Sequence, residues 1–313
     1  MIETKGLRKS FRARKQTVDA VRGVDLAVAE GEIFGFLGPN GAGKTTTLRM
    51  LATLVEPDGG EATVAGVDLR RSPGEVRKRI GYVAQGGGTW EEVTAREELV
   101  LQARLFGIGK PEARRRAAAA IEAFQLAEFA DRPCKTYSGG QRRRVDIALG
   151  VVHQPRLVFL DEPTTGLDPQ SRAHMWDEVR RLRAEGMTVF LTTHYLEEAD
   201  ALCDRVSIID YGEIVAEGTP DELKRAVAGD VVTLGLNGSA AKAAELLTVE
   251  PYVRSAEPGD GELRLYVDEG GSAIPQILRL LDGAGLPLGS IELHRPSLDD
   301  VFLAKTGRSL REA

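Results

Sequence analysis

This chain is organised around Gly38-Pro39-Asn40-Gly41-Ala42-Gly43-Lys44-Thr45, a stretch that matches the phosphate-loop pattern GxxxxGK[ST]. A short apolar run, residues 33–37, precedes it and is typical of a buried parallel strand. Thr45 and Thr46 open a predicted helix. Glycines allow several backbone N–H groups to face one anion, and the helix N-terminus adds partial positive charge. A Gly-rich turn without a ligand is the alternative, but the pattern favours a nucleotide site in which Lys44 reaches the outer phosphates and Thr45 binds Mg²⁺.

The composition is that of a soluble globular protein. The 313 residues are 28% charged and 42% hydrophobic, and the formal net charge of −6 argues against a general nucleic-acid binder. The apolar runs are far shorter than the ~20 residues of a membrane-spanning helix, and no signal-peptide core follows Met1. Cys134 and Cys203 are too few for a disulfide framework or a zinc site. These features predict a cytoplasmic protein.

Two domains are predicted, at residues 1–228 and 229–313. The first begins with β-rich segments and a basic turn at residues 12–15. A helical subdomain is expected at about residues 90–150, and strands then alternate with helices over residues 157–210. This alternation favours a parallel sheet with covering helices, so the fold class is α/β.

The second predicted domain is a small α+β unit. Its expected elements follow the order strand, helix, two hairpin strands, helix, strand and a final helix that starts at Leu298 with Ser297 as its N-cap. This order resembles a split βαβ arrangement. Gly259-Asp260-Gly261 supports the hairpin turn, and Gly229-Asp230 marks the expected boundary with the first domain.

Two carboxylates follow a second apolar run, residues 157–160. Asp161 would lie at the carboxyl edge of the parallel sheet, where open α/β sheets bind ligands, and would hold Mg²⁺. Glu162 would orient or deprotonate an attacking water. Without the phosphate loop, the pair could equally be a solvated acidic turn.

A second anion-binding element is predicted at Ser138-Gly139-Gly140-Gln141, which follows Tyr137 and opens a helix. A serine-glycine loop alone is more often an ordinary helix start. With the phosphate loop 94 residues earlier (138 − 44), the chain resembles the ATP-binding-cassette ATPases, whose signature is usually Leu-Ser-Gly-Gly-Gln. Tyr137 replaces the leucine and leaves the anion-binding residues in place.

The resemblance covers roughly residues 1–225 and implies a P-loop ATPase fold. That fold has a mixed sheet core, an antiparallel β subdomain and a helical subdomain. It also implies that ATP and Mg²⁺ are the ligands, and that two copies of the chain close head-to-tail. The Lys44 loop of one copy and the Ser138 loop of the other would then sandwich each ATP.

Further site residues are implied by the same resemblance. Gln85 matches the glutamine that reaches Mg²⁺ and the attacking water, and His194 matches the histidine that contacts the γ-phosphate. Asp168 matches the loop that crosses the dimer interface, although it could simply cap a helix. Phe11 is the best match for the aromatic ring that stacks on adenine, although it could serve only in packing.

A transporter subunit fits better than a cassette ATPase that acts on ribosomes, DNA or chromosomes. The spacing of 94 residues leaves no room for the long coiled coils of chromosome proteins, one cassette is present rather than two, and zinc-binding cysteine clusters are missing. The permease is expected to be a separate polypeptide, with this chain on the cytoplasmic face of the membrane and no nucleic-acid partner.

Residues 137–148, 91–97 and 295–303 are similar to the daunorubicin-resistance export branch of the family. The resemblance implies ATP-driven efflux of a drug-like or lipophilic compound. A subunit that exports lipid, oligosaccharide or ions is the alternative, with a soluble non-transport ATPase behind it. We expect residues 229–313 to stabilise the homodimer or regulate its closure. The arginine run 142–144 is expected to be a helix face near the nucleotide interface, and a solvated charged face is the more common interpretation of such a run.

Overall fold

Runs of consecutive apolar residues lie within three strands that are buried on both faces in the computed structural model. These strands are β3 (Ile33–Leu37), β7 (Leu157–Asp161) and β8 (Thr188–Thr193), and each is buried at every residue. Parallel strands covered on both faces need apolar side chains on both, which explains the unbroken apolar runs. The structure describes residues 1–13, 16–227, 229–236, 239–259 and 262–308.

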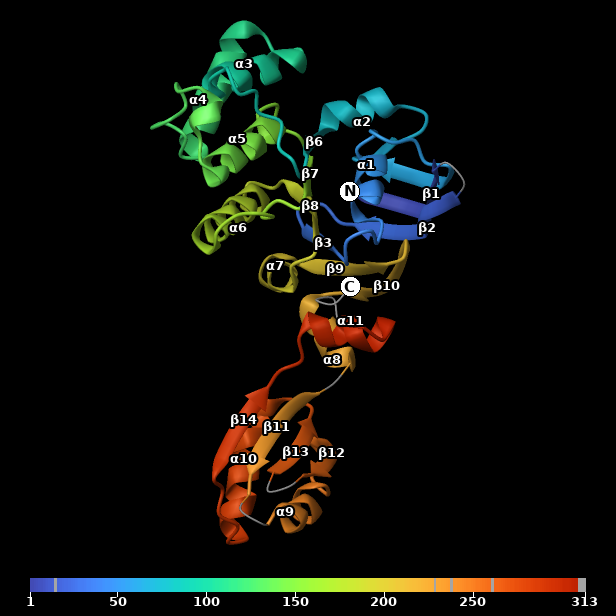
Figure 1. The fold of residues 1–313 in the computed structure, drawn as a ribbon, viewed down its shortest axis with the longest axis vertical. Helices are drawn as coiled ribbons and strands as arrows, with labels where there is room; N and C mark the ends of the chain where they lie inside the picture. Colours follow the sequence, from blue (N-terminus) through green and yellow to red (C-terminus); the bar gives the residue numbers. More distant parts are fainter. Residues whose placement is uncertain (14–15, 228, 237–238, 260–261, 309–313) are drawn as a thin grey trace. The chain divides into compact units, whose positions relative to one another are not determined.

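The described residues of the first compact unit, Met1–Glu217, form two sheets and the helices that accompany them. The remaining elements up to β10 are β1 (Ile2–Ala13), β2 (Gln16–Val28), α1 (Lys44–Leu51), β4 (Gly59–Val64), β5 (Val67–Asp68), α2 (Pro73–Arg79), β6 (Ile80–Val83), α3 (Ala95–Leu105), α4 (Lys110–Ala123), the 3-10 helix η1 (Cys134–Thr136), α5 (Gly139–Val151), α6 (Pro169–Ala184), α7 (Leu196–Leu202), β9 (Arg205–Asp210) and β10 (Glu213–Gly218). The strand orders are β10-β9-β3-β8-β7-β6 and β2-β1-β4-β5. Every pair from β9 to β6 runs parallel, as the strand–helix alternation predicts. Helix α1 lies on one face of the six-stranded sheet, and α6 and α7 lie on the other (Figure 1).

An aromatic cluster holds the centre of the six-stranded sheet. The ring of Phe190 lies 5.5 Å from that of Phe34, 5.7 Å from that of Phe36 and 5.6 Å from that of Phe159, measured between centroids. Leu48 of α1 packs into the same core. The loop between β3 and α1 is therefore anchored at both ends by buried side chains.

Helix α5 can approach strand β6 because glycines face each other there. A Cβ atom on Gly81 would lie 2.1 Å from the carbonyl oxygen of Gly150, and one on Gly150 would lie 2.6 Å from Cγ2 of Val83. The neighbouring helix α3 begins with a capping box, in which the Thr94 side chain accepts from the Glu97 amide. Helices α3 and α4 lie beyond α5, away from the centre of the sheet (Figure 1).

The residues from Gly218 onward form a separate compact unit. Its elements are α8 (Pro220–Val227), β11 (Asp230–Gly235), α9 (Ala240–Leu247), β12 (Val253–Pro258), β13 (Glu262–Val267), α10 (Gly270–Gly283), β14 (Ser290–His294) and α11 (Leu298–Thr306). The sheet order β12-β13-β11-β14, with all neighbours antiparallel, confirms the predicted split βαβ arrangement. Helices α9 and α10 pack on this sheet over a core that includes Val232, Leu265 and Ile277.

Helix α11 packs against α8 within this second unit. Ser297 caps α11 in a capping box with Asp300, as the sequence predicts for Ser297. The predicted domain boundary at Gly229 falls between α8 and β11, and it stays a prediction. Two residues of the predicted hairpin turn, Asp260 and Gly261, lie outside the described residues.

Some elements are missed by the sequence patterns. Helix α2 contains a single buried residue, Val76, so it shows no apolar periodicity. Strand β1 continues through Arg12 to Ala13, where a turn is predicted, because it pairs with β2 along this ribbon; the rest of that predicted turn, residues 14 and 15, is not described. Strand β10 and helix α8 are also absent from the prediction. None of the helices in the described ranges combines the length and apolar character that a bilayer crossing requires.

Replacing Gly81 by alanine should destabilise the first unit. The added methyl would meet main-chain atoms of α5, which cannot move aside as a flexible side chain can, so we expect the free energy of unfolding to fall by about 1–3 kcal/mol. Urea denaturation followed by tryptophan fluorescence measures this, since both tryptophans, Trp90 and Trp176, lie in that unit. Gly109→Ala is the control because a Cβ there meets nothing within 4 Å. Equal midpoints for the two variants would contradict the close approach.

Candidate active site

The phosphate loop closes as its glycines require. Gly41 and Gly43 have φ angles of 80° and 105°, and Gly43 is the N-cap of α1. A Cβ atom on Gly43 would lie 2.3 Å from the carbonyl oxygen of Ala20, and one on Gly38 would lie 2.3 Å from that of Ile209. Because main chain fills the space beside both residues, no side chain fits there, and the loop can only take this path with glycine.

The Lys44 ammonium is buried inside its own loop. Its Nζ donates to the carbonyl oxygens of Gly38 at 2.7 Å and Pro39 at 3.0 Å, and it lies 3.5 Å from Oε1 of Glu162. Burial lowers the pKa of Lys44, while the charges of Glu162 and Asp161 act in the opposite direction. In this structure the partners of the ammonium are thus two carbonyl oxygens of the loop and one carboxylate.

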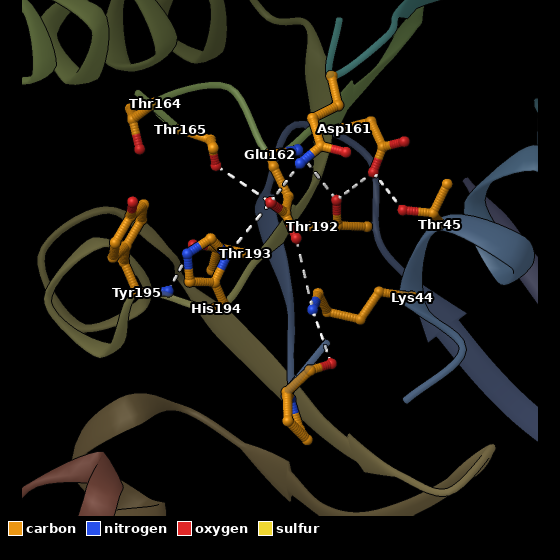
Figure 2. A network of polar contacts seen from close by, with 12 residues as sticks. Lys44, Thr45, Asp161, Glu162, Thr164, Thr165, Thr192, Thr193, His194 and Tyr195 are labelled. Atoms are coloured by element: carbon orange, nitrogen blue, oxygen red, sulfur yellow. Dashed lines mark hydrogen bonds and ion pairs between the residues drawn. The ribbon is translucent and has the colours of Figure 1, made fainter. Parts of the chain in front are cut away.

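Asp161 lies at the carboxyl end of β7 between two hydroxyl groups. Thr45 Oγ1 and Thr192 Oγ1 both donate to Oδ1, at 2.9 Å and 2.7 Å (Figure 2). The other oxygen, Oδ2, is buried and has no hydrogen-bond partner among the described residues. A buried carboxylate oxygen without a partner is costly. Together with the Thr45 hydroxyl it forms the kind of hard oxygen set that divalent cations prefer, so these residues fit Mg²⁺.

Glu162 is the centre of a polar network (Figure 2). Its Oε2 accepts from Gln85 Nε2 at 2.8 Å and from Thr165 Oγ1 at 3.0 Å. His194 Nδ1 lies 3.2 Å from the same oxygen, a contact that becomes an ion pair when the imidazole is protonated. The structure thus joins Lys44, Thr45, Gln85, Asp161, Glu162 and His194 in one site.

The Glu162 backbone is strained. Its φ of 44° lies in the left-handed region, which costs a non-glycine residue roughly 1–3 kcal/mol. The amide N–H of Glu162 donates to both Oγ1 and the carbonyl oxygen of Thr192, at 3.0 Å and 3.2 Å. These bonds hold the residue with its carboxylate toward Lys44, and only 6% of the residue is exposed.

The Ser138 motif stands apart from this network. Ser138 is the exposed N-cap of α5: its Oγ accepts from the Gln141 amide at 3.2 Å, and its own amide donates to Gln141 Oε1 at 3.0 Å. Gly139 and Gly140 form the first turn of the helix. Ser138, Gly140 and Gln141 line a surface cavity of about 600 Å³. Among the described residues, no hydrogen bond joins this motif to Lys44 or Glu162.

Two other predicted residues also lie outside the network. Phe11, 42% exposed, stands opposite Val18 in the β1–β2 ribbon, and the Lys9 ammonium is 5.5 Å from its ring centroid. The same ribbon reaches the phosphate loop at Ala20. Asp168 is the N-cap of α6 and accepts from the Ser171 amide at 2.9 Å. It therefore caps a helix, and its contact with nucleotide stays a prediction, as does that of Phe11.

Thr165, Thr192 and Arg143 are residues at the site that the sequence patterns miss. Thr192 carries no motif of its own. Arg143 is predicted to be solvated, but this is wrong: only 6% of it is exposed, and it donates to main-chain carbonyls beneath the site. The buried positions Arg143, Asp146, Ile147 and Gly150 follow the i, i+3, i+4, i+7 spacing of one helix face. That spacing identifies Arg143 as a residue of the packed face.

Comparisons with known proteins agree with this geometry. The family model described as "ABC transporter" matches residues 21–165, and the model described as "ATP-binding protein DrrA1-3-like, C-terminal domain" matches residues 218–306. The daunorubicin/doxorubicin resistance ATP-binding protein DrrA of Streptomyces peucetius is 47% identical over 320 residues, which cover 100% of this chain and 96% of that protein. The daunorubicin resistance ATP-binding protein DrrA2 of Streptomyces coeruleorubidus is 47% identical over 92% of this chain and 90% of its own.

Solved structures resemble the first unit. A dimeric ATP-binding cassette in a post-hydrolysis state, bound to ADP and Pi, has a TM-score of 0.65 and 27% sequence identity. It covers 70% of this chain and 98% of its own. The residues that form the network around Glu162 all belong to the first unit.

Thr192→Val should destabilise the nucleotide-free protein. The variant removes the hydroxyl that donates to Asp161 and accepts from the Glu162 amide, so we expect the free energy of unfolding to fall by about 1–3 kcal/mol. Urea denaturation followed by tryptophan fluorescence measures the change. Thr63→Val in β4 is the control, since the Thr63 hydroxyl makes no hydrogen bond among the described residues. A loss of the same size in both variants would show that Thr192 does not support the site.

Proposed function

Since the chain belongs to the ATP-binding-cassette ATPases of the daunorubicin/doxorubicin resistance branch, we propose that it energises export of a drug-like or lipophilic compound through a separate permease. ATP binding and hydrolysis are the activities of this family. The observation that carries the proposal is the network around the strained Glu162, in which Lys44, Thr45, Asp161, Gln85 and His194 converge.

The phosphate loop would bind the triphosphate through the α1 N-terminus and its backbone N–H groups, from Gly38 to Thr46. Lys44 would exchange the carbonyls of Gly38 and Pro39 for phosphate oxygens, which are better partners for a buried ammonium. Thr45, Asp161 and Gln85 would hold Mg²⁺, which neutralises phosphate charge when it is bound.

Glu162 would act as the general base for the attacking water. Its carboxylate is held by Gln85 and Thr165, so it needs little reorganisation to accept a proton. His194 lies beside the same oxygen and would contact the γ-phosphate. Strain at Glu162 is consistent with this role, because strained backbone is retained where the surrounding structure holds it for function.

A second copy of the chain would complete each site. The Ser138 motif presents the free N-terminus of α5, but it is not bonded to the network of its own chain. In a head-to-tail pair, Ser138, Gly139, Gly140 and Gln141 of one copy would close over ATP held by the other, with Asp168 at the interface and Phe11 stacked on adenine. The dimeric state of the solved relative supports this assembly.

The relatives support a proposal for the transported compound and for the location. The names of the two similar proteins describe resistance to daunorubicin or doxorubicin. We infer that this chain acts on the cytoplasmic face of the membrane, bound to its permease, and that its cargo is of a comparable drug-like kind.

Glu162→Gln tests the proposed chemistry. The amide cannot accept the proton of water, so we expect ATP hydrolysis to fall by about 10²–10⁴-fold while ATP-bound dimers persist. Phosphate release and size-exclusion chromatography with ATP measure the two effects. Lys44→Ala is the comparison variant: it should lose nucleotide binding or hydrolysis and form no ATP-dependent dimer. Normal turnover in Glu162→Gln would exclude Glu162 as the base.

Truncation tests the proposed role of the C-terminal part in stabilising the homodimer or regulating its closure. Because α8 packs with α11, the cut is best placed after Glu217, at the edge of the first compact unit. We expect a chain that ends there to bind ATP, since the whole network lies before the cut, but to form less ATP-dependent dimer. The full-length chain is the reference for ATPase activity and transport, and dimers are compared with the Glu162→Gln change present in both the full-length and the truncated chain. Unchanged dimerisation, ATPase activity and transport would remove this role.

A further inference from the structure

Arg143 connects three parts of the site through main-chain carbonyls. Its side chain extends from α5, and Nε donates to the oxygen of Pro163 at 2.8 Å. Nη1 donates to the oxygen of Ala84 at 2.6 Å. Nη2 donates to the oxygens of Asp161 at 3.1 Å and Glu162 at 3.4 Å. The planar guanidinium thus binds both the strand end before Gln85 and the turn that contains Glu162.

The surroundings of Arg143 keep this guanidinium buried and charged. Burial lowers the pKa of Arg143, and the carboxylates of Asp146, Asp161 and Glu198 act in the opposite direction. Arginine remains protonated in proteins, so all of its N–H groups stay donors. A buried cation without partners would be strongly destabilising. The guanidinium therefore needs these carbonyls as partners, and its hydrogen bonds in turn fix their positions.

Arg143 and the Ser138 motif lie on the same helix, α5. Arg143 lies five positions after Ser138, about 7.5 Å along the helix axis. Asp146, on the same helix face, accepts from the Gly88 amide at 3.0 Å, so α5 also holds the segment after Gln85. A shift of α5 would therefore reach Gln85 and Glu162 together.

We propose that Arg143 is a positioning residue that couples the Ser138 end of α5 to the orientation of Glu162. The inference rests on the proposed function, in which the Ser138 motif meets nucleotide and Glu162 is the base. The Glu162 backbone has a φ of 44°, a conformation that persists only when the surrounding contacts hold it. Arg143 binds the carbonyls of residues 161, 162 and 163, on both sides of that strained residue.

The test compares arginine variants in the full-length chain. In Arg143→Met the carbonyl contacts are lost, and we expect kcat to fall at least about tenfold, part of the ~10²–10⁴-fold that a positioned base supplies. Affinity for a fluorescent ATP analogue should stay within about threefold, because Arg143 makes no contact with the phosphate loop among the described hydrogen bonds. Arg143→Lys keeps the charge with fewer donors and should recover part of kcat.

Arg116→Met is the matched control. Arg116 is also a partly buried arginine that donates to one main-chain carbonyl, that of His153 at 3.0 Å, but it lies on α4 away from the site. We expect its kcat to stay close to that of the original chain. If Arg143→Met fails to fold, as judged by its unfolding curve, Arg143→Lys carries the comparison. An unchanged kcat in the folded Arg143 variants would overturn the inference.

A double-variant cycle separates this role from a merely structural one. If Arg143 acts through Glu162, adding Arg143→Met to Glu162→Gln should lower single-turnover phosphate release little further. Independent, multiplying losses would overturn the inference. If Glu162→Gln lost most of its hydrolysis while Arg143→Met kept normal activity, the role of Arg143 would be overturned and the role of Glu162 as the base would stand. Normal turnover in Glu162→Gln would overturn the proposed base, and the inference with it.

Discussion

The Glu162 peptide is held at positive φ by contacts from several directions, and the other parts of the site are arranged around it. Thr192 of β8 binds its amide, Arg143 of α5 binds its carbonyl, and Gln85 binds its carboxylate. These groups come from separate segments of the chain. They meet because the carboxyl ends of parallel strands converge at one edge of a sheet, where loops can reach a common ligand.

The site also concentrates buried charge. Nζ of Lys44 lies 3.5 Å from Oε1 of Glu162, and both side chains are buried. Oδ2 of Asp161 has no hydrogen-bond partner among the described residues. Removing such charges from water is costly unless they find partners. In this state the carbonyls of the phosphate loop and the neighbouring hydroxyls serve as partners. A site of this kind suits a ligand that brings phosphate anions and a divalent cation together.

The Ser138 motif is the second anion-binding element that we propose, and it lies at the start of α5. Its distance in sequence from Lys44 and its absence from the Glu162 network agree with a site that two copies share. In the proposed function Arg143 has a role beyond stability, since it lies on the helix that begins at this motif and binds the turn that carries Glu162. The C-terminal unit has its own core and matches the C-terminal model of the same branch.

The patterns that the sequence determines are local ones. The phosphate loop, the capping boxes at Thr94 and Ser297 and the buried strands can be recognised because a few neighbouring residues contain the whole signal. The order of the C-terminal elements likewise predicts their sheet. The convergence of Lys44, Asp161 and Glu162 could be expected once strand ends and motifs were combined.

Only the tertiary structure decides which polar side chains hold that site together. Arg143 belongs to a run of arginines that resembles a solvated surface, and Thr192 is one of two neighbouring threonines at a strand end. Their partners, Pro163 and Asp161, lie 20 and 31 residues away. Once buried, these side chains form hydrogen bonds within the protein because a polar group removed from water needs a partner. The packing of α5, β7 and β8 determines which partner each of them meets.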